Sequence, residues 1–486
     1  MVATILLLFS FLNFINAIVP DCKDGKIIFD QPSHKTSYPA NFSSPGPVFP
    51  ANFKCEFQIN VPEGWYALVE LSLISPNDSQ SSAVIFDQLN RSETVFVAES
   101  ESFYFIASGG RIQFSTGSDG TKFGFIVSWD TYSPFIFHGG RVNASDTVPF
   151  IPIHYSTGSI VISAETKVSA TVLRPSNGTL LSHFRGIIFF DGPSYNNTKN
   201  LGTGLQLWNG NTQYVSTGNS MTVLILDFYI TANAFVVFQD YELTKGIKSF
   251  QGENCDIYNP CGSFTLDATN GPAALQIYTR DDVNFISDLS GSGHLDVYIG
   301  TASQNKTNLV TTYHVGETSS SLPQQVFGYF KTFLLTDGNA TITFNNTFIY
   351  GTLYVSAGTT GFFSSDRYGT YAVQNCQATL SSSPYKSTVK IRWSVSYIDL
   401  VEDSWLEVYG DQIINNERVT YIKNYNASNP PHLNSYEEFI GTSMNVIFND
   451  RGYRNKGFLM RYEIEKSSNR IFMLLNFVLV FIVYFD

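Results

Sequence analysis

Charged side chains are scarce in this chain. Asp, Glu, Lys and Arg make up 14% of its 486 residues, and the 41 acidic residues outnumber the 29 basic ones. Binding to nucleic acid depends on clusters of Lys and Arg that neutralise phosphates. The sequence contains no such cluster, and its formal net charge is −12. We therefore predict no nucleic-acid partner.

Sequence signatures of catalysis are missing as well. The seven histidines stand in no motif, and the chain has neither a G-x-S-x-G nor a G-x-x-x-x-G-K-[ST] segment. None of the five cysteines has the spacing of a zinc ligand. We expect a protein without enzymatic activity or cofactor, although a pair of glycosidase carboxylates can lie far apart in a sequence.

Long helical periodicity is absent outside the two ends of the chain. Instead, Val, Ile, Thr, Tyr and Phe alternate with polar residues in short runs, as in residues 67–73 (ALVELSL) and 389–395 (VKIRWSV). Hydrophobic residues make up 43% of the chain and aromatic residues 15%, which excludes general disorder. The pattern predicts an all-β protein of antiparallel β-sandwich modules.

A recurring pattern of three strands divides the chain. The first strand ends in an aromatic and a turn residue and is expected at residues 84–90, 205–210, 295–300 and 406–410. A second strand is expected at residues 110–114, 220–226, 339–344 and 443–448. A third is expected at residues 123–129, 234–238, 348–355 and 457–462. We predict four modules, at residues 18–131, 132–250, 251–364 and 365–466.

The chain begins with the features of a secretory signal peptide. Residues 4–14 read TILLLFSFLNF, and the small residue Ala17 follows shortly after them. An apolar run of about 7–15 residues that ends near a small residue is typical of such a peptide. We predict that residues 1–17 are a signal peptide.

The other end of the chain is also apolar. Residues 471–485 (IFMLLNFVLVFIVYF) would span roughly 22 Å as a helix, less than the ~30 Å hydrocarbon core. That length suits the tail of a GPI-attachment signal over residues 467–486, with Ser467, Ser468 and Asn469 as candidate attachment residues. The alternative is a short, tilted membrane anchor. Either one places the protein at the extracellular face of the plasma membrane.

Acceptor triplets for N-glycosylation are spread along the chain. We expect a glycosylated surface, because the chain is predicted to enter the secretory pathway. The triplets begin at Asn41, Asn77, Asn90, Asn143, Asn177, Asn196, Asn305, Asn339, Asn345 and Asn426.

Four short segments resemble the CUB domain, a β-sandwich module. They are residues 55–59 (CEFQI), 406–411 (LEVYGD), 448–450 (FND) and 457–462 (GFLMRY). The resemblance covers residues 18–131 and about 365–466, and it is loose between them. Together with the apolar ends and the acceptor triplets, these segments are similar to a nematode family of secreted proteins with CUB-like domains. The resemblance implies tandem CUB-like sandwiches of jelly-roll type.

The resemblance also implies a disulfide between Cys22 and Cys55, the first disulfide of the family, worth roughly 3–4 kcal/mol in the chain-entropy model. We expect Cys255 and Cys261 to close a small local loop. Cys376 is then left either as a buried thiol or as part of an intermolecular bridge.

Some CUB domains bind calcium on one loop edge. The corresponding positions here are Glu402, Asp403 and Asp450, with Asp399 as a substitute, and oxygen ligands from separate loops suit calcium. Solvated loop carboxylates are the alternative.

The resemblance implies a cell-surface glycoprotein that recognises an extracellular protein or glycan. Members of the nematode family are associated with innate immune defence against bacteria. The resemblance therefore implies the same role for this chain, and a location in membrane rafts. The alternative is a structural, glycan-clad coat or spacer without a specific ligand. Saturable binding of a ligand would separate the two.

Overall fold

The computed structural model describes most of the chain between residues 22 and 467. The described residues are 22–31, 35–76, 80–117, 119–132, 136–151, 158–175, 178–195, 199–227, 235–255, 260–279, 283–318, 320–345, 352–382, 387–415 and 417–467. The predicted signal peptide, Asn77, Asn177, Asn196, Ser468, Asn469 and the apolar residues 471–485 lie outside them. Two compact units divide the chain: the first ends at Ile136 and takes in Arg185–Ile187, and the second comprises the rest.

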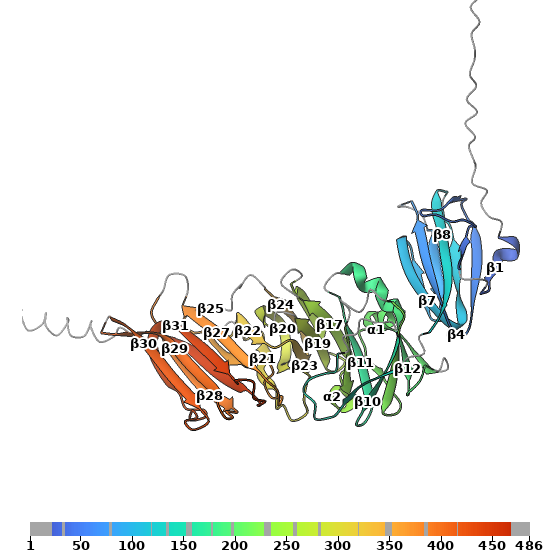
Figure 1. The fold of residues 1–486 in the computed structure, drawn as a ribbon. Coiled ribbons are helices and arrows are strands. Elements are labelled where there is room, and N and C mark those ends of the chain that lie inside the picture. The colour runs from blue at the N-terminus through green and yellow to red at the C-terminus, as the bar shows by residue number, and fades with distance from the viewer. Residues whose placement is uncertain are drawn as a thin grey trace, which may run out of the picture. The chain divides into compact units, whose positions relative to one another are not determined.

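The first unit is one β-sandwich module (Figure 1). Its strand order is β2-β8-β4-β7-β5-β6. Its elements are η1 (Lys23–Gly25), β1 (Lys26–Phe29), β2 (Lys35–Tyr38), β3 (Val48–Phe49), β4 (Lys54–Ile74), β5 (Ser82–Phe86), β6 (Ser92–Val95), β7 (Ala98–Ser115) and β8 (Thr121–Thr131). The alternating burial of β4 and β8 sends their apolar side chains into a core rich in phenylalanine. Phe114 and Phe123 stack there with ring centroids 3.9 Å apart.

The second module opens the second unit with two sheets, β13-β12-β15-β10-β9 and β14-β11-β16. Its elements are β9 (Ile136–Val142), β10 (Gly158–Ala164), β11 (Val168–Leu173), η2 (Gly178–Gly186), β12 (Ile187–Asp191), β13 (Asn200–Thr203), α1 (Gly204–Asn209), β14 (Tyr214–Val215), β15 (Ser220–Ile225), β16 (Phe235–Asp240) and α2 (Tyr241–Thr244).

The strand predicted at residues 205–210 is wrong, because these residues form helix α1. Thr203 caps the helix and forms a reciprocal capping box with Gln206. That pair satisfies the first backbone donors of a helix and outweighs the alternating apolar pattern of the segment.

The third module is a two-layered sandwich. Its elements are β17 (Ser249–Cys255), β18 (Ser263–Asp267), β19 (Ala273–Thr279), β20 (Val283–Ile299), β21 (Leu309–Val315), β22 (Gln324–Phe327), β23 (Phe330–Leu335) and β24 (Asn339–Phe344). One layer contains β17, β19, β23, β21 and the second half of β20. The other contains β18, β24, β22 and the first half of β20. The long strand β20 therefore belongs to both layers.

The fourth module contains a sheet with the order β25-β27-β31-β28-β32-β26. Its elements are β25 (Thr352–Val355), β26 (Thr360–Ser364), β27 (Asn375–Ser382), β28 (Val389–Ile398), β29 (Trp405–Ile414), β30 (Glu417–Asn426), β31 (Glu437–Asn449) and β32 (Phe458–Lys466). The predicted boundary at residue 364 is too late. Both β25 and β26 pair with strands of this sheet, and β24 is already the last strand of the third module.

The first, third and fourth modules share one strand topology. In each, the first strand pairs in parallel with an inner strand: β1 with β4, β17 with β19, and β25 with β27. In each, the second strand pairs antiparallel with the last: β2 with β8, β18 with β24, and β26 with β32. The three-strand pattern expected from the sequence does not hold in the third module. Residues 339–344 form its last strand, β24, and residues 352–355 form β25, which pairs in the fourth module.

The third and fourth modules do not have separate cores. Phe362 and Leu459 of the fourth module lie in the core of the third, and Phe285 and Phe327 of the third lie in the core of the fourth. Gln324, with no exposed surface, joins β22 to β26: its side-chain amide donates to the Phe362 carbonyl (2.9 Å) and accepts from the Phe362 N–H (3.2 Å).

Replacing Gln324 by Leu is expected to destabilise the second unit by about 2–4 kcal/mol, because it leaves a buried N–H and a buried carbonyl without their partner. The matched control is Gln325→Leu. Gln325 is equally buried, and no hydrogen bond is found for its side-chain amide in the described part of the chain. Urea unfolding of the secreted chain should show a lower midpoint for Gln324→Leu than for Gln325→Leu. Equal midpoints would contradict the role given to Gln324.

The second and third modules meet along β11 and β17. The Arg174 N–H donates to the Gly252 carbonyl (2.9 Å), and the Asn254 N–H donates to the Arg174 carbonyl (3.0 Å). Glu253 lies between Gly252 and Asn254 in β17. Burial raises the pKa of its carboxyl to about 7, and the charge of Arg174 opposes this rise only in part.

The raised pKa of Glu253 predicts a pH-dependent stability. A carboxyl that binds its proton more tightly in the folded state stabilises that state fully below its unfolded pKa of 4.5, and this contribution is lost as the pH rises to about 7. The loss corresponds to about 3 kcal/mol. Glu253→Gln should reduce the fall in melting temperature between pH 4.5 and 7.5, and the exposed Glu317→Gln should not. An unchanged pH dependence in Glu253→Gln would contradict this assignment.

Candidate functional site

A polar cleft of about 980 Å³ lies within the second unit, and all three of its modules contribute to it. The second module supplies residues 144–147 and Glu165, and the third supplies residues 303–307. The fourth supplies residues 368–371, Tyr397 and Lys456. Its walls therefore come from segments more than 200 residues apart in the chain.

The wall from the second module is fixed by backbone hydrogen bonds to the third. The Thr301 N–H donates to the Thr147 carbonyl (2.9 Å), and the Thr301 hydroxyl donates to the Asp146 carbonyl (3.1 Å). The Asp146 carboxylate accepts the N–H of Asn143 (2.7 Å), which closes the turn. Gly300 has a φ of 86°, and a Cβ there would lie 1.9 Å from the Thr147 oxygen, so the close approach requires glycine.

The wall from the third module is a short turn held from beneath. Asn308 is fully buried and donates to two backbone carbonyls at 2.6 Å each, while it accepts the Ser303 hydroxyl (2.5 Å). Lys306 forms an ion pair of 2.8 Å with Asp296, whose other oxygen accepts the Thr312 hydroxyl (2.5 Å). Because these bonds fix the turn, they also restrict the positions of the polar side chains at its surface.

The wall from the fourth module carries three tyrosines. Tyr371 is 63% exposed, whereas Tyr368 is 7% exposed and packs edge-on against Tyr397 at 5.8 Å between ring centroids. Burial raises the pKa of Tyr368 and of Tyr397, so both hydroxyls stay protonated at neutral pH. The Gly369 N–H donates to the Lys456 carbonyl (3.0 Å) and fixes the turn between them.

Hydroxyl, amide, ammonium and aromatic groups thus converge on one hollow. Tyrosine offers a rigid, amphipathic contact surface, and Ser, Thr, Asn and Gln offer hydrogen bonds that adapt to a ligand. This chemistry suits a polar ligand with hydroxyl groups and apolar ring faces.

Both expected disulfides are present. Cys22 pairs with Cys55, and Cys255 pairs with Cys261. Cys376 is 4% exposed and lies in the core of the fourth module.

The structure does not gather the expected calcium ligands. Among the described residues, no group of three or more His, Cys, Asp or Glu side chains is arranged to hold a metal ion. Asp450 is 1% exposed, and its carboxylate accepts the backbone N–H groups of Gln374 and Gly452. Glu402 forms a hydrogen bond with Tyr453, which raises the pKa of that hydroxyl. These carboxylates are used in fixing loops.

Seven of the ten glycosylation candidates are among the described residues. Asn41, Asn90, Asn305, Asn339 and Asn426 are exposed, and Asn143 and Asn345 are half-buried. Asn305 stands in the wall of the cleft.

Two histidine–aspartate pairs were missed by the sequence analysis. The distance between His183 Nδ1 and Asp227 Oδ2 is 2.6 Å, and that between His294 Nδ1 and Asp337 Oδ1 is 2.9 Å. The partners are more than 40 residues apart and belong to no motif, so only the fold reveals them. None of the four lines the cleft.

No helix in the described parts of the chain is long and apolar enough to cross a membrane.

Comparison with known protein families divides the chain in a similar way. Residues 17–133 match a CUB-like domain. Residues 141–226 and 242–347 match two domains of unknown function, DUF7592 and DUF7591. The CUB-like domain and the two disulfides agree with an extracellular protein that has a recognition or structural role. No curated protein matches the chain.

Solved structures resemble the chain only distantly. The CUB1-EGF-CUB2 domains of rat MASP-1 are 9% identical, with a TM-score of 0.15, over 43% of this chain and 99% of that one. The same region of human MASP-1/3 is 10% identical, with a TM-score of 0.16, over 42% and 98%. A chain of Sulfolobus Turreted Icosahedral Virus is 10% identical, with a TM-score of 0.16, over 87% and 86%.

Proposed function

We propose that this chain is a non-enzymatic extracellular recognition protein that binds a glycan in the cleft of its second unit. The observation that carries the proposal is the convergence of Tyr371, Lys456 and the polar turn at residues 303–307 on one open hollow of about 980 Å³. The CUB-like domain and the disulfides support the extracellular setting.

A glycan suits this cleft better than an apolar protein segment. Sugar hydroxyls can exchange hydrogen bonds with the side chains of Ser303, Gln304 and Thr307, and the exposed ring of Tyr371 can stack on a sugar ring face. Peptide anchors are usually large apolar side chains that enter dry pockets, whereas this lining combines tyrosine rings with many polar side chains. A protein ligand is the second candidate, favoured only by the CUB-like domain of the first unit.

The biological setting rests on the resemblance to the nematode family. By that analogy the protein is held at the cell surface, in membrane rafts, by a GPI anchor and takes part in innate defence against bacteria, with bacterial polysaccharide as the first ligand to test. The competing proposal is a glycan-clad spacer, which would bind no ligand saturably.

Replacing Tyr371 by Ala is expected to weaken glycan binding roughly tenfold or more, because it removes the exposed ring of the cleft. The control is Tyr354→Ala in β25, which is 48% exposed and outside the cleft. The secreted chain would be screened on an array of bacterial and host glycans, and the best ligand titrated by calorimetry. Equal affinities of the two variants would show that the glycan does not bind in the cleft. The absence of saturable binding to any glycan would favour the proposal of a spacer without a ligand.

Asn305 supplies a second test of the same cleft. A glycan attached there would stand in the cleft wall and compete with an incoming ligand. Asn305→Gln is expected to keep or increase the affinity, and the control Asn426→Gln, at the end of β30, should leave it unchanged. A loss of binding in Asn305→Gln would show that this asparagine or its glycan is itself part of the ligand-binding surface.

The proposed anchor makes a separate prediction. Treatment of intact cells that express the full chain with a phosphatidylinositol-specific phospholipase should release the protein from the surface, because a GPI anchor is attached only through its lipid. A chain truncated after residue 466 should appear in the medium without treatment. Retention of the full chain after treatment would identify residues 471–485 as a membrane span.

A further inference from the structure

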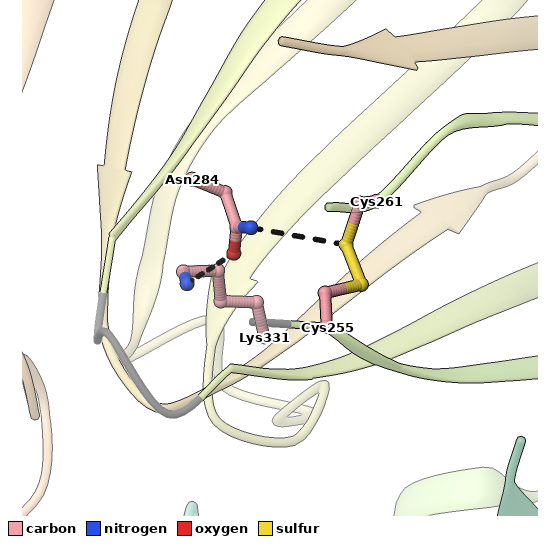
Figure 2. Close-up of a disulfide and its surroundings, with 4 residues drawn as sticks. All are labelled: Cys255, Cys261, Asn284 and Lys331. Atoms are coloured by element: carbon pink, nitrogen blue, oxygen red, sulfur yellow. Dashed lines mark hydrogen bonds between the residues drawn. A yellow bond between two sulfur atoms is a disulfide. The ribbon is translucent and has the colours of Figure 1, made fainter. Parts of the chain in front are cut away.

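A lysine and an asparagine meet in the core of the third module (Figure 2). Lys331 is 0% exposed and Asn284 is 1% exposed. The Lys331 Nζ donates to the Asn284 Oδ1 over 2.6 Å. Lysine is among the residues most rarely buried in full, because its charged form is costly to remove from water. A fully buried lysine in direct contact with an amide therefore calls for an explanation.

The two side chains come from different layers of the sandwich. Lys331 lies on β23, which pairs with β19 and with the second half of β20. Asn284 lies at the start of β20, where that strand pairs with β22 in the other layer. Their contact therefore crosses from one layer to the other.

The disulfide beside them crosses between the same layers. Cys255 ends β17 in the layer of Lys331, and Cys261 precedes β18 in the layer of Asn284. The Asn284 Nδ2 donates to the Cys261 Sγ over 3.8 Å, so the disulfide, the amide and the amine form one continuous chain of contacts (Figure 2). This end of the sandwich already carries one covalent tie between its layers.

We propose that Lys331 and Asn284 form a second tie, an intramolecular amide bond between the lysine amine and the asparagine side chain. The neutral Lys331 Nζ attacks the Asn284 Cγ, and a new C–N bond forms. The bond from Cγ to Nδ2 breaks, and Nδ2 leaves as ammonia with a proton from the attacking amine. One amine and one amide thus give one secondary amide and one ammonia, without an oxidant, a reductant or a cofactor.

The surroundings favour this step. Burial disfavours the charged form of an amine and so favours the neutral form that can attack. Two reacting groups held in contact by a folded core gain a large effective concentration over the same groups in solution. The core also excludes water, which protects the product from hydrolysis. The proposal is independent of the cleft, because it concerns residues that do not line it.

The test is a peptide map of the secreted full chain after removal of N-linked glycans and reduction of disulfides. Trypsin should fail to cleave after Lys331, and a branched peptide should join residues 281–306 to residues 307–367. Its mass should be lower than the sum of the two linear peptides by the mass of ammonia, about 17 Da. Fragmentation should place the branch at Asn284 and Lys331.

The variant Asn284→Ala serves as the control and should give only linear peptides cut after Lys331. The wild-type map alone decides the question if this variant is not secreted. Complete cleavage after Lys331 in the wild type, with a linear peptide of unaltered mass that contains Asn284, would overturn the proposal and leave a hydrogen bond. That result would leave glycan binding at the cleft unaffected.

Discussion

The second unit depends on the burial of apolar surface across the boundaries of its modules. Phe362 and Leu459 complete the core of the third module, while Phe285 and Phe327 complete that of the fourth. Such burial also removes polar groups from water, and each of these groups needs a hydrogen-bond partner. Gln324 satisfies both backbone groups of Phe362, and the Thr171 hydroxyl donates to the buried Gln276 across the other boundary (2.6 Å). The cleft exists because these contacts hold three modules together.

The sequence predicted the fold class, because alternation of apolar residues is a local signal that strands carry. It placed the boundary between the third and fourth modules too late, since alternation marks a strand without saying which sheet accepts it. The pairing of β25 with β27 and of β26 with β32 decides that question. The segment at residues 205–210 forms a helix instead of the expected strand because the reciprocal bonds of Thr203 and Gln206 start a helix, a signal that the apolar alternation of the segment does not carry.

The candidate cleft could not be predicted from the sequence at all. Asp146, Asn305 and Tyr371 belong to no motif and approach each other only through the packing of three modules. The same holds for the contact of Lys331 with Asn284, whose residues lie in different layers. The use made of Asp450 was hidden from the sequence for a related reason: its carboxylate accepts hydrogen bonds from two backbone N–H groups that no motif reveals.

The shared strand topology gives Cys376 a counterpart in the first module. Cys55 is the second residue of β4 and faces Phe114, and Cys376 is the second residue of β27 and faces Phe448. The two cysteines are therefore equivalent, but the sequence has no cysteine between Cys261 and Cys376 that could take the part of Cys22.

The shared cores have a consequence for how such a protein can be inherited. The first module closes around its own core and could be gained or exchanged alone, whereas a cut between the third and fourth modules would expose the interior of both.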